Sequence, residues 1–426
     1  MDIQTLSSAG AINESEPIVQ EKPGHRVSRA LLAVLLLLPI YVGRVHELFH
    51  FLDGLPIAKV ATGLALLVIF FDGRRQKGFL AELVSFPQVR NLSWLLVFAV
   101  LSLPFSVWRG ASVDFLADFL KNLLFIMLML YSVRSESDVR KVAWALILSA
   151  FMLTIGSFIE PQFVEDGRVY VINGFDPNEF ALFLLMVLSL ALFVMEGEKG
   201  WRKLLLIGII LLGMVAIFRT GSRGGLIALL GVAAILMSRK GLKYAIAVSP
   251  AVMLLAVILL MNVDEARWER FATILSPEQD YNTTDSTGRI EVWKNGIELF
   301  FANPLFGVGM GVFPVAEGIH HGREGKWSAA HNAGIQVGAE LGVGGLIMFL
   351  LLLSSSISAV RRNGNGPPWL RRGVEFGLYV YCIGAFFLSW AYALTLYFFV
   401  ALSVICARLG RESLKARAHA GSNGVR

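Results

Sequence analysis

The chain has 426 residues, of which 55% are hydrophobic and only 16% are charged. This composition indicates a polytopic membrane protein and excludes an ordinary soluble enzyme, because a soluble fold of this length would not bury so much apolar surface. The formal net charge is +6, but Lys and Arg stand in short clusters between apolar runs, as topology determinants do, which argues against nucleic-acid binding. Cys382 and Cys406 both lie in apolar runs, so neither a disulfide framework nor a cysteine metal site is expected.

Apolar runs along the chain predict an all-α integral membrane protein with about 12 transmembrane helices. They cover residues 30–42, 55–71, 92–107, 113–131, 142–158, 179–195, 204–218, 224–237, 243–262, 333–358, 374–388 and 391–407. Residues 1–29 form a polar cytoplasmic tail, and no cleavage site follows the first run, which therefore predicts an uncleaved helix. We expect helices 1–9 within 30–262, a large outer loop at 263–332, helices 10–12 within 333–409, and a cytoplasmic C-terminal tail at 410–426.

Charge sets the expected orientation. With both termini in the cytoplasm, most Lys and Arg fall on the cytoplasmic side, which is the positive-inside pattern. The opposite side or the helix ends facing it hold Arg44, Arg109, Arg168, Arg219, Arg223, Arg267, Arg270, Arg289 and Arg323. Many arginines with few lysines favour planar, bidentate binding of phosphate or carboxylate. Ion pairs with nearby Asp and Glu are the alternative.

The turn Phe218–Leu226 joins two apolar helices on this outer side. Its glycines would let a phosphate approach a helix N-terminus, and Arg223 adds a guanidinium there. The alternative is a tight turn in which Gly221 and Gly225 form a small-residue packing face.

The outer loop contains a second candidate. Arg289 begins a stretch in which Ile290, Trp293, Ile297 and Phe300 form an apolar stripe, so we predict an amphipathic helix lying along the membrane face. A cation in the first turn of a helix opposes the helix dipole, which suggests a partner for Arg289.

The glycine-rich segment 303–313 that follows lacks a preceding strand and is no nucleotide fingerprint. We expect it to fold back over the site.

His331 follows Ala329-Ala330 and opens the next apolar helix. A histidine there is reachable from the outer face yet partly desolvated, which suits a general base. An interfacial histidine without chemistry is the alternative.

Two other histidine groups compete as metal sites: His46-Glu47-Leu48-Phe49-His50, which matches H-E-x-x-H, and His320-His321 with His331. The first lies just past the first helix, with no distant acidic ligand inside an apolar run, and the second lacks carboxylate or cysteine ligands, so we expect no metal site.

The order of these motifs resembles the O-antigen ligase and polymerase superfamily. The resemblance covers roughly 220–346. Its motifs are Thr220–Gly225, Thr287-Gly288-Arg289 with Trp293, Asn303–Gly309, His331-Asn332 and Gly342–Gly345. Each motif alone is weak, but their order is fairly specific.

The resemblance implies a GT-C-like polyprenyl-phosphate glycosyltransferase fold in the bacterial inner membrane, with the active site facing the periplasm. The implied O-antigen ligase transfers O-antigen from undecaprenyl pyrophosphate to a sugar hydroxyl of lipid A-core. His331 would be the catalytic base, and Arg223, Arg289, Arg219 and Asn332 would bind the pyrophosphate or glycan. Direct attack by the acceptor hydroxyl predicts inversion at the anomeric carbon. No Asp-x-Asp pair occurs, the nearest being Glu278-Gln279-Asp280, so we expect the enzyme to need no metal or cofactor.

Three alternatives remain at this stage. An O-antigen polymerase would use the same donor with a second lipid-linked glycan as acceptor, and we favour the ligase because one dominant outer loop stands directly before His331-Asn332. A transporter would use the arginines as an anion path, but we find no internal repeat. An intramembrane zinc protease would require the His46–His50 motif inside a membrane helix.

Overall fold

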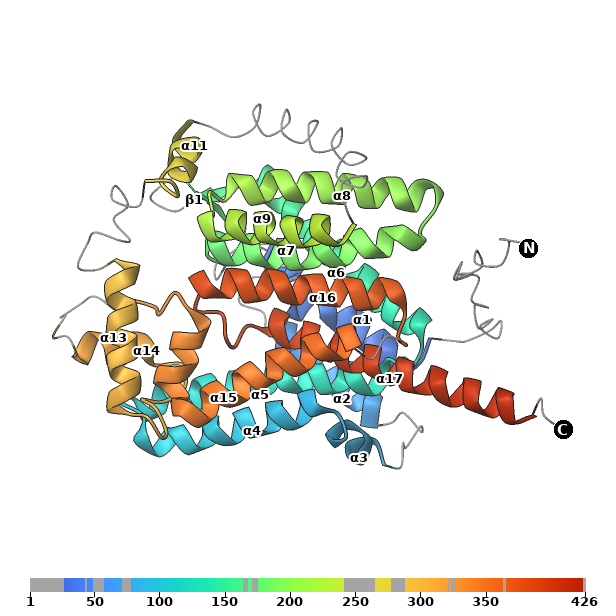
Figure 1. The fold of residues 1–426 in the computed structure, drawn as a ribbon, viewed down its shortest axis with the longest axis horizontal. Coiled ribbons are helices and arrows are strands. Elements are labelled where there is room, and N and C mark those ends of the chain that lie inside the picture. Colours follow the sequence, from blue (N-terminus) through green and yellow to red (C-terminus); the bar gives the residue numbers. More distant parts are fainter. Residues whose placement is uncertain are drawn as a thin grey trace, which may run out of the picture.

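Helices occupy the apolar runs that the sequence predicted (Figure 1). The computed structural model describes residues 27–42, 44–48, 57–70, 78–163, 168–170, 175–240, 265–276, 288–320, 322, 327–362 and 365–423. The expected helix at 243–262, the tail at 1–26 and His50 lie outside these residues. Every other expected helix is present.

Between Val27 and Arg219, the elements that the structure describes are helices and one short strand pair. Its elements are α1 (Arg29–Tyr41), η1 (Val45–Leu48), α2 (Ile57–Phe70), α3 (Phe79–Val84), α4 (Pro87–Ser102), η3 (Leu103–Phe105), α5 (Arg109–Ser132), α6 (Glu136–Ile159), β1 (Gln162–Phe163), β2 (Val169–Tyr170), α7 (Pro177–Val194), η4 (Met195–Gly197) and α8 (Gly200–Arg219). The two strands pair antiparallel, with Gln162 opposite Tyr170.

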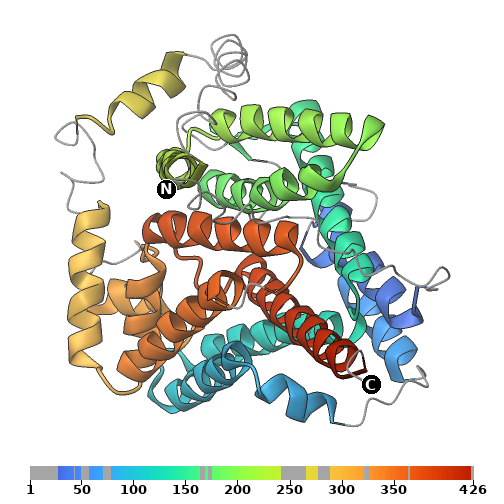
Figure 2. The ribbon, with the colours of Figure 1, turned by 45° about the vertical axis from the view of Figure 1, so that its right-hand side comes forward.

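The second half contributes the site. It consists of α9 (Arg223–Lys240), α11 (Glu265–Ala272), α13 (Arg289–Ala302), α14 (Phe313–His320), α15 (Ala333–Arg362), α16 (Pro368–Gly384), η6 (Ala385–Phe387) and α17 (Leu394–Asn423). Figures 1 and 2 both place α16 between α7 and α15, with α4 on the far side of α15. Segments far apart in sequence thus form one bundle.

Six of the described helices are long and apolar enough to cross a membrane. They cover Pro87–Phe105, Glu136–Ile159, Pro177–Gly197, Gly200–Arg219, Ala333–Arg361 and Leu394–His419. The prediction of a helical membrane protein is confirmed at this level. The count of 12 crossings and the GT-C-like fold stay predictions, because α2 and α16, with 14 and 17 residues, are short for a full crossing.

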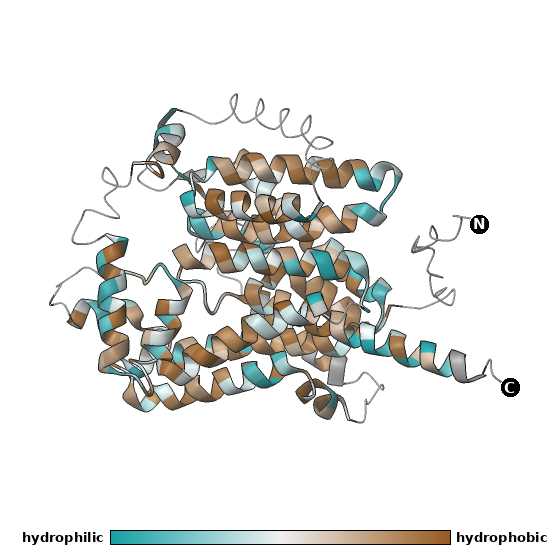
Figure 3. Ribbon diagram, in the orientation of Figure 1, coloured by the Kyte–Doolittle hydropathy of each residue, from teal (hydrophilic) through white to brown (hydrophobic). Residues whose placement is uncertain are grey.

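The centre of the bundle is α7, whose sequence from Phe180 to Val194 is apolar on almost every side. Such a helix needs neighbours all round, and α6, α8, α9 and α16 supply them. Figure 3 shows hydrophilic residues gathering toward the two ends of the bundle. At the end opposite α13, the charges pair with one another: Glu375 binds Arg239 at 2.9 Å and Arg361 at 3.3 Å.

Helix α15 is kinked at Gly342, whose φ of 70° and ψ of −169° are not helical. This backbone conformation is essentially restricted to glycine. The kink frees backbone groups of α15, and the segment 304–309 binds them. Val343 N–H donates to Pro304 O (2.8 Å), Val308 N–H donates to Ala339 O (2.9 Å) and Gly309 N–H donates to Glu340 O (3.1 Å). The glycine-rich segment therefore folds back onto the start of α15.

Helix α13 packs on α14 through a side-chain hydrogen bond and on α15 through a close approach at a glycine. Val292, Asn295, Gly296 and Leu299 are buried, and Asn295 Nδ2 donates to Glu317 Oε1 at 2.8 Å. A Cβ at Gly296 would lie 2.4 Å from Ile335 Cγ2, so glycine permits this approach. The predicted helix is present. The predicted apolar stripe is not the face that packs on α14 and α15, since Ile297 remains 47% exposed.

Gly342→Ala is expected to destabilise the fold by on the order of 2 kcal/mol or more, because its backbone conformation strains any side chain. In addition, the new Cβ would lie 2.6 Å from the backbone of Leu305. Thermal unfolding of the detergent-solubilised protein measures the change. Gly208→Ala in α8 is the matched control, since a Cβ there meets nothing within 4 Å. Equal unfolding temperatures for the two variants would contradict the role assigned to the kink.

Candidate active site

His331 lies at the start of α15 in a strained backbone conformation. Its φ is +48°, a value that residues other than glycine adopt only when the surroundings enforce it. The surrounding contact is a hydrogen bond from His331 N–H to Ser389 Oγ at 2.7 Å. Ser389 belongs to the loop between η6 and α17, so this loop holds the backbone of His331 in place.

Asn332 caps α15. Its Oδ1 accepts hydrogen bonds from Gly334 N–H (2.9 Å) and Ile335 N–H (3.0 Å), and its Nδ2 donates to Phe386 O (3.2 Å). Asparagine is among the best residues for this position because its side chain satisfies the free N–H groups of the first turn. The amide is thus engaged within the protein, and it joins the start of α15 to η6.

The surroundings of His331 hold its imidazole neutral. Burial, followed by the positive charge of Arg289, lowers the pKa of His331 to about 4; Asp176 raises it and Arg168 lowers it further. Asp176 is the N-cap of α7. The structure therefore brings together two sequence-predicted residues, His331 and Arg289, with two that the prediction did not include in the site. Above about pH 4 the imidazole of His331 is unprotonated, so it can accept a proton from a substrate.

Arg223 and Arg219 lie on neighbouring helix ends. Arg223 Nη1 donates to Thr273 Oγ1 at 2.7 Å. Arg219 Nη1 donates to Ser157 O at 3.2 Å, and its guanidinium lies over the ring of Phe158, 4.4 Å from the centroid. Arg219 thus contacts the end of α6, whereas Arg223 contacts the segment after α11.

The glycines of this turn are packed. A Cβ at Gly224 would lie 3.1 Å from Phe387 Cβ, and one at Gly225 would lie 3.1 Å from Ala181 Cβ. Ser222 Oγ accepts a hydrogen bond from Gly225 N–H at 3.1 Å. These contacts fit the packing interpretation of the turn. They also place the start of α9 against η6, the same element that Asn332 contacts.

Trp293 connects α13 to this region. Its ring meets Phe386 edge-on, with centroids 5.4 Å apart. Its Nε1–H is buried and has no hydrogen-bond acceptor among the described residues. A buried donor without an acceptor is unfavourable by roughly 1–3 kcal/mol. A ligand oxygen at this position would satisfy it.

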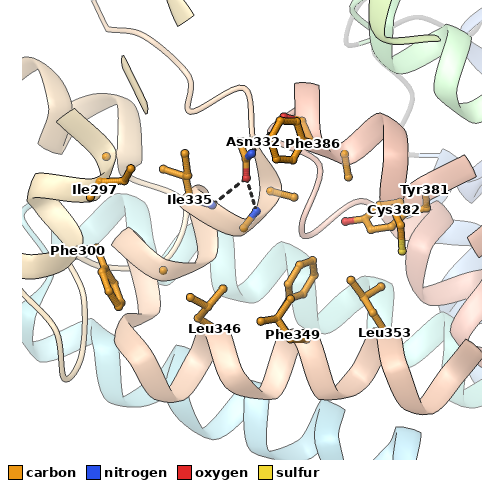
Figure 4. Close-up of a pocket in the computed structure, with 16 residues that line it drawn as sticks. Ile297, Phe300, Asn332, Ile335, Leu346, Phe349, Leu353, Tyr381, Cys382 and Phe386 are labelled. Carbon is orange, nitrogen blue, oxygen red and sulfur yellow. Dashed lines mark hydrogen bonds between the residues drawn. The ribbon is translucent and has the colours of Figure 1, made fainter. Parts of the chain in front are cut away.

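An apolar groove of about 500 Å³ adjoins the site (Figure 4). Leu346, Phe349 and Leu353 point toward it from the part of α15 beyond the kink. Asn332 lines the groove at its polar end, and Ile297 lines it from α13. The groove thus exists because α15 bends.

Sequence reasoning missed Arg168, Asp176 and Ser389 as site residues. Arg168 stood out only as one of several outer arginines, and no local motif pointed to Asp176 or Ser389. The zinc alternative gains no support in the part of its motif that the structure describes, since Glu47 pairs with Arg44 at 2.7 Å. His50 lies outside the described residues.

Together, the long apolar helices and the polar site at one end define a helical membrane protein with a basic, histidine-containing site. Residues 207–350 match the family model described as O-antigen ligase. Over this segment, which is about a third of the chain, the match supports the resemblance to the O-antigen ligase and polymerase superfamily that the motifs indicated. The matched segment contains Arg219, Arg223, Arg289, His331 and Asn332. A search among curated proteins finds no match.

Arg289→Gln is expected to raise the pKa of His331 above the wild-type value of about 4, because the positive charge of Arg289 helps to lower it. Arg289→Lys keeps that charge and should keep the pKa low. Histidine NMR of the purified protein measures the titration midpoint, with the signal assigned by His331→Gln. A midpoint that is the same in Arg289→Gln and wild type would show that Arg289 does not influence His331.

Proposed function

We propose that this protein is an O-antigen ligase, a glycosyltransferase that moves O-antigen polysaccharide from undecaprenyl pyrophosphate to a sugar hydroxyl of lipid A-core. The reaction takes place on the periplasmic side of the bacterial inner membrane. One observation carries the proposal: within the segment that matches the O-antigen ligase family model, a partly buried histidine is kept neutral under the influence of the positive charges of Arg289 and Arg168. A neutral base next to phosphate-binding cations is what such a transfer requires.

His331 accepts the proton of the acceptor hydroxyl. The hydroxyl oxygen bonds to the anomeric carbon as the bond from that carbon to the pyrophosphate oxygen breaks, and the electron pair leaves with undecaprenyl pyrophosphate. Direct displacement inverts the anomeric carbon. In the free enzyme the neighbouring cations disfavour protonation of His331. A bound pyrophosphate reverses that effect, because its negative charge stabilises the imidazolium that forms.

Arg289 and Arg168 bind the pyrophosphate and stabilise the charge that develops as it leaves. Arg223 begins α9, which packs against η6, and adds a further guanidinium for the donor, together with Arg219 at the end of α8. Trp293 donates its indole N–H to a phosphate oxygen. Asn332 acts as a positioning residue: its hydrogen bonds to α15 and η6 fix the direction of His331.

The proposal predicts that His331→Ala reduces glycan transfer by about 10²- to 10⁴-fold and that Arg289→Ala reduces it by about 10²- to 10³-fold. The assay uses detergent-solubilised protein with purified undecaprenyl-pyrophosphate-linked O-antigen and lipid A-core. Glu291→Ala is the matched control, since Glu291 pairs with exposed Lys294 in the first turn of α13. Longer glycans on the donor lipid, without product on lipid A-core, would identify a polymerase instead.

Transfer is expected to continue in the presence of a chelator, because the sequence offers arginines for the pyrophosphate and lacks an Asp-x-Asp pair. The same assay, run with excess EDTA, measures this directly. Loss of product that Mg²⁺ or Mn²⁺ restores would show that a metal ion takes part.

A further inference from the structure

We propose that the apolar groove between α13, α15 and α16 binds the first isoprene units of the donor's polyprenyl chain, those nearest the pyrophosphate. This inference rests on the proposed function, since it names the part of the donor lipid that the protein recognises.

The lining of the groove suits a hydrocarbon chain. The part of α15 before the kink contributes Ile335 and Gly338, the part beyond it contributes Leu346 and Phe349, and α16 contributes Ala385. A chain that leaves water for such a surface gains roughly 0.8 kcal/mol for each buried methylene. Among the described residues, those that line the groove carry no charged side chain.

The groove is continuous with the polar site. Asn332, next to His331, lines its inner end, and Figure 4 shows Asn332 above the apolar side chains. On α13, Arg289 is followed by Ile297 and Phe300, which line the groove about 12 to 17 Å further along the helix. A pyrophosphate beside Arg289 therefore has its chain directed toward these residues.

The groove also opens sideways. Ile297 is 47% exposed and Leu350 is 53% exposed, although both line it. Leu350 lies on α15, which is long and apolar enough to cross a membrane, so we expect this opening to face lipid. A long lipid can therefore extend out of the groove into the membrane without passing through water.

The volume limits how much of the chain fits. If each carbon takes about the 30 Å³ that a water molecule occupies in the liquid, a groove of about 500 Å³ holds on the order of 15 carbons. This corresponds to about three isoprene units. The rest of an undecaprenyl chain would lie in the bilayer, where it adds little to recognition.

The test measures binding, independently of glycan transfer. Geranyl, farnesyl, geranylgeranyl and undecaprenyl pyrophosphate, none carrying a glycan, compete with labelled undecaprenyl pyrophosphate for the protein in nanodiscs. We expect affinity to rise up to farnesyl or geranylgeranyl and then to level off. Affinity that rises steadily to undecaprenyl, or that does not depend on chain length, would overturn the proposal.

Two variants fill the groove from opposite sides. Gly338→Leu acts from α15, and Cys382→Trp acts from α16. Each should weaken undecaprenyl pyrophosphate binding about tenfold or more, because displacing two buried methylene groups already changes an equilibrium constant about tenfold. Inorganic pyrophosphate should bind both variants as it binds wild type.

A matched control outside the groove separates filling of the groove from a general effect of added bulk. Gly208→Leu adds the same side chain on α8, where a Cβ meets nothing within 4 Å. This variant should bind like wild type. Wild-type affinity in Gly338→Leu and Cys382→Trp, with unfolding temperatures unchanged, would refute the groove assignment.

The two proposals can fail separately. Chain-length-dependent binding without any glycan transfer by wild type would overturn the ligase and leave the groove standing. Transfer by wild type, together with unaltered donor binding in both filled variants, would overturn the groove and leave the ligase standing. Competition by phospholipid equal to that by geranylgeranyl pyrophosphate would show that the groove holds ordinary membrane lipid.

Discussion

The kink of α15 at Gly342 is the constraint on which the site depends. A straight helix would satisfy its own backbone groups and leave nothing for the segment 304–309 to bind. Because the helix bends, three hydrogen bonds hold that segment against α15, and the parts of α15 before and after the bend form two walls of the apolar groove. The same helix begins at the Asn332 cap, so one element determines the positions of His331, the fold-back segment and the groove.

Electrostatics makes this arrangement suitable for chemistry. A partly buried histidine under the influence of cations has a lowered pKa and is kept neutral. In the proposed reaction, the negative charge of a bound donor would offset that influence and make His331 a stronger base. The strained φ of His331, held by Ser389, is the kind of local cost that folds tolerate where a side chain must point in one direction.

Much of the fold could be predicted from the sequence, because long apolar runs have few alternatives to helix. The number of crossings could not, since a run of 14 to 17 residues fits either a tilted crossing or a partial one. In the site, Arg289 and His331 were identifiable from local pattern. Arg168 and Asp176 were not, because they reach His331 only through the packing of α7. The role of Asn332 as a cap was readable from its place before an apolar helix, yet the motif drew attention to binding instead.

The proximity of the polar site and the apolar groove follows from the chemistry of an amphipathic lipid substrate. Its headgroup needs cations that are partly shielded from water, because exposed charges are screened, and its chain needs a path that never leaves an apolar environment. Placing the cations at a helix bundle's end and the groove along its side meets both needs with the same helices. Helix α13 illustrates this: the charge of its first residue, Arg289, lowers the pKa of His331, while Ile297 and Phe300 further along line the groove. A change in the tilt of α13 would therefore move the groups that we propose for the phosphate and for the lipid chain together, which would keep the reacting carbon of the proposed donor in register with His331.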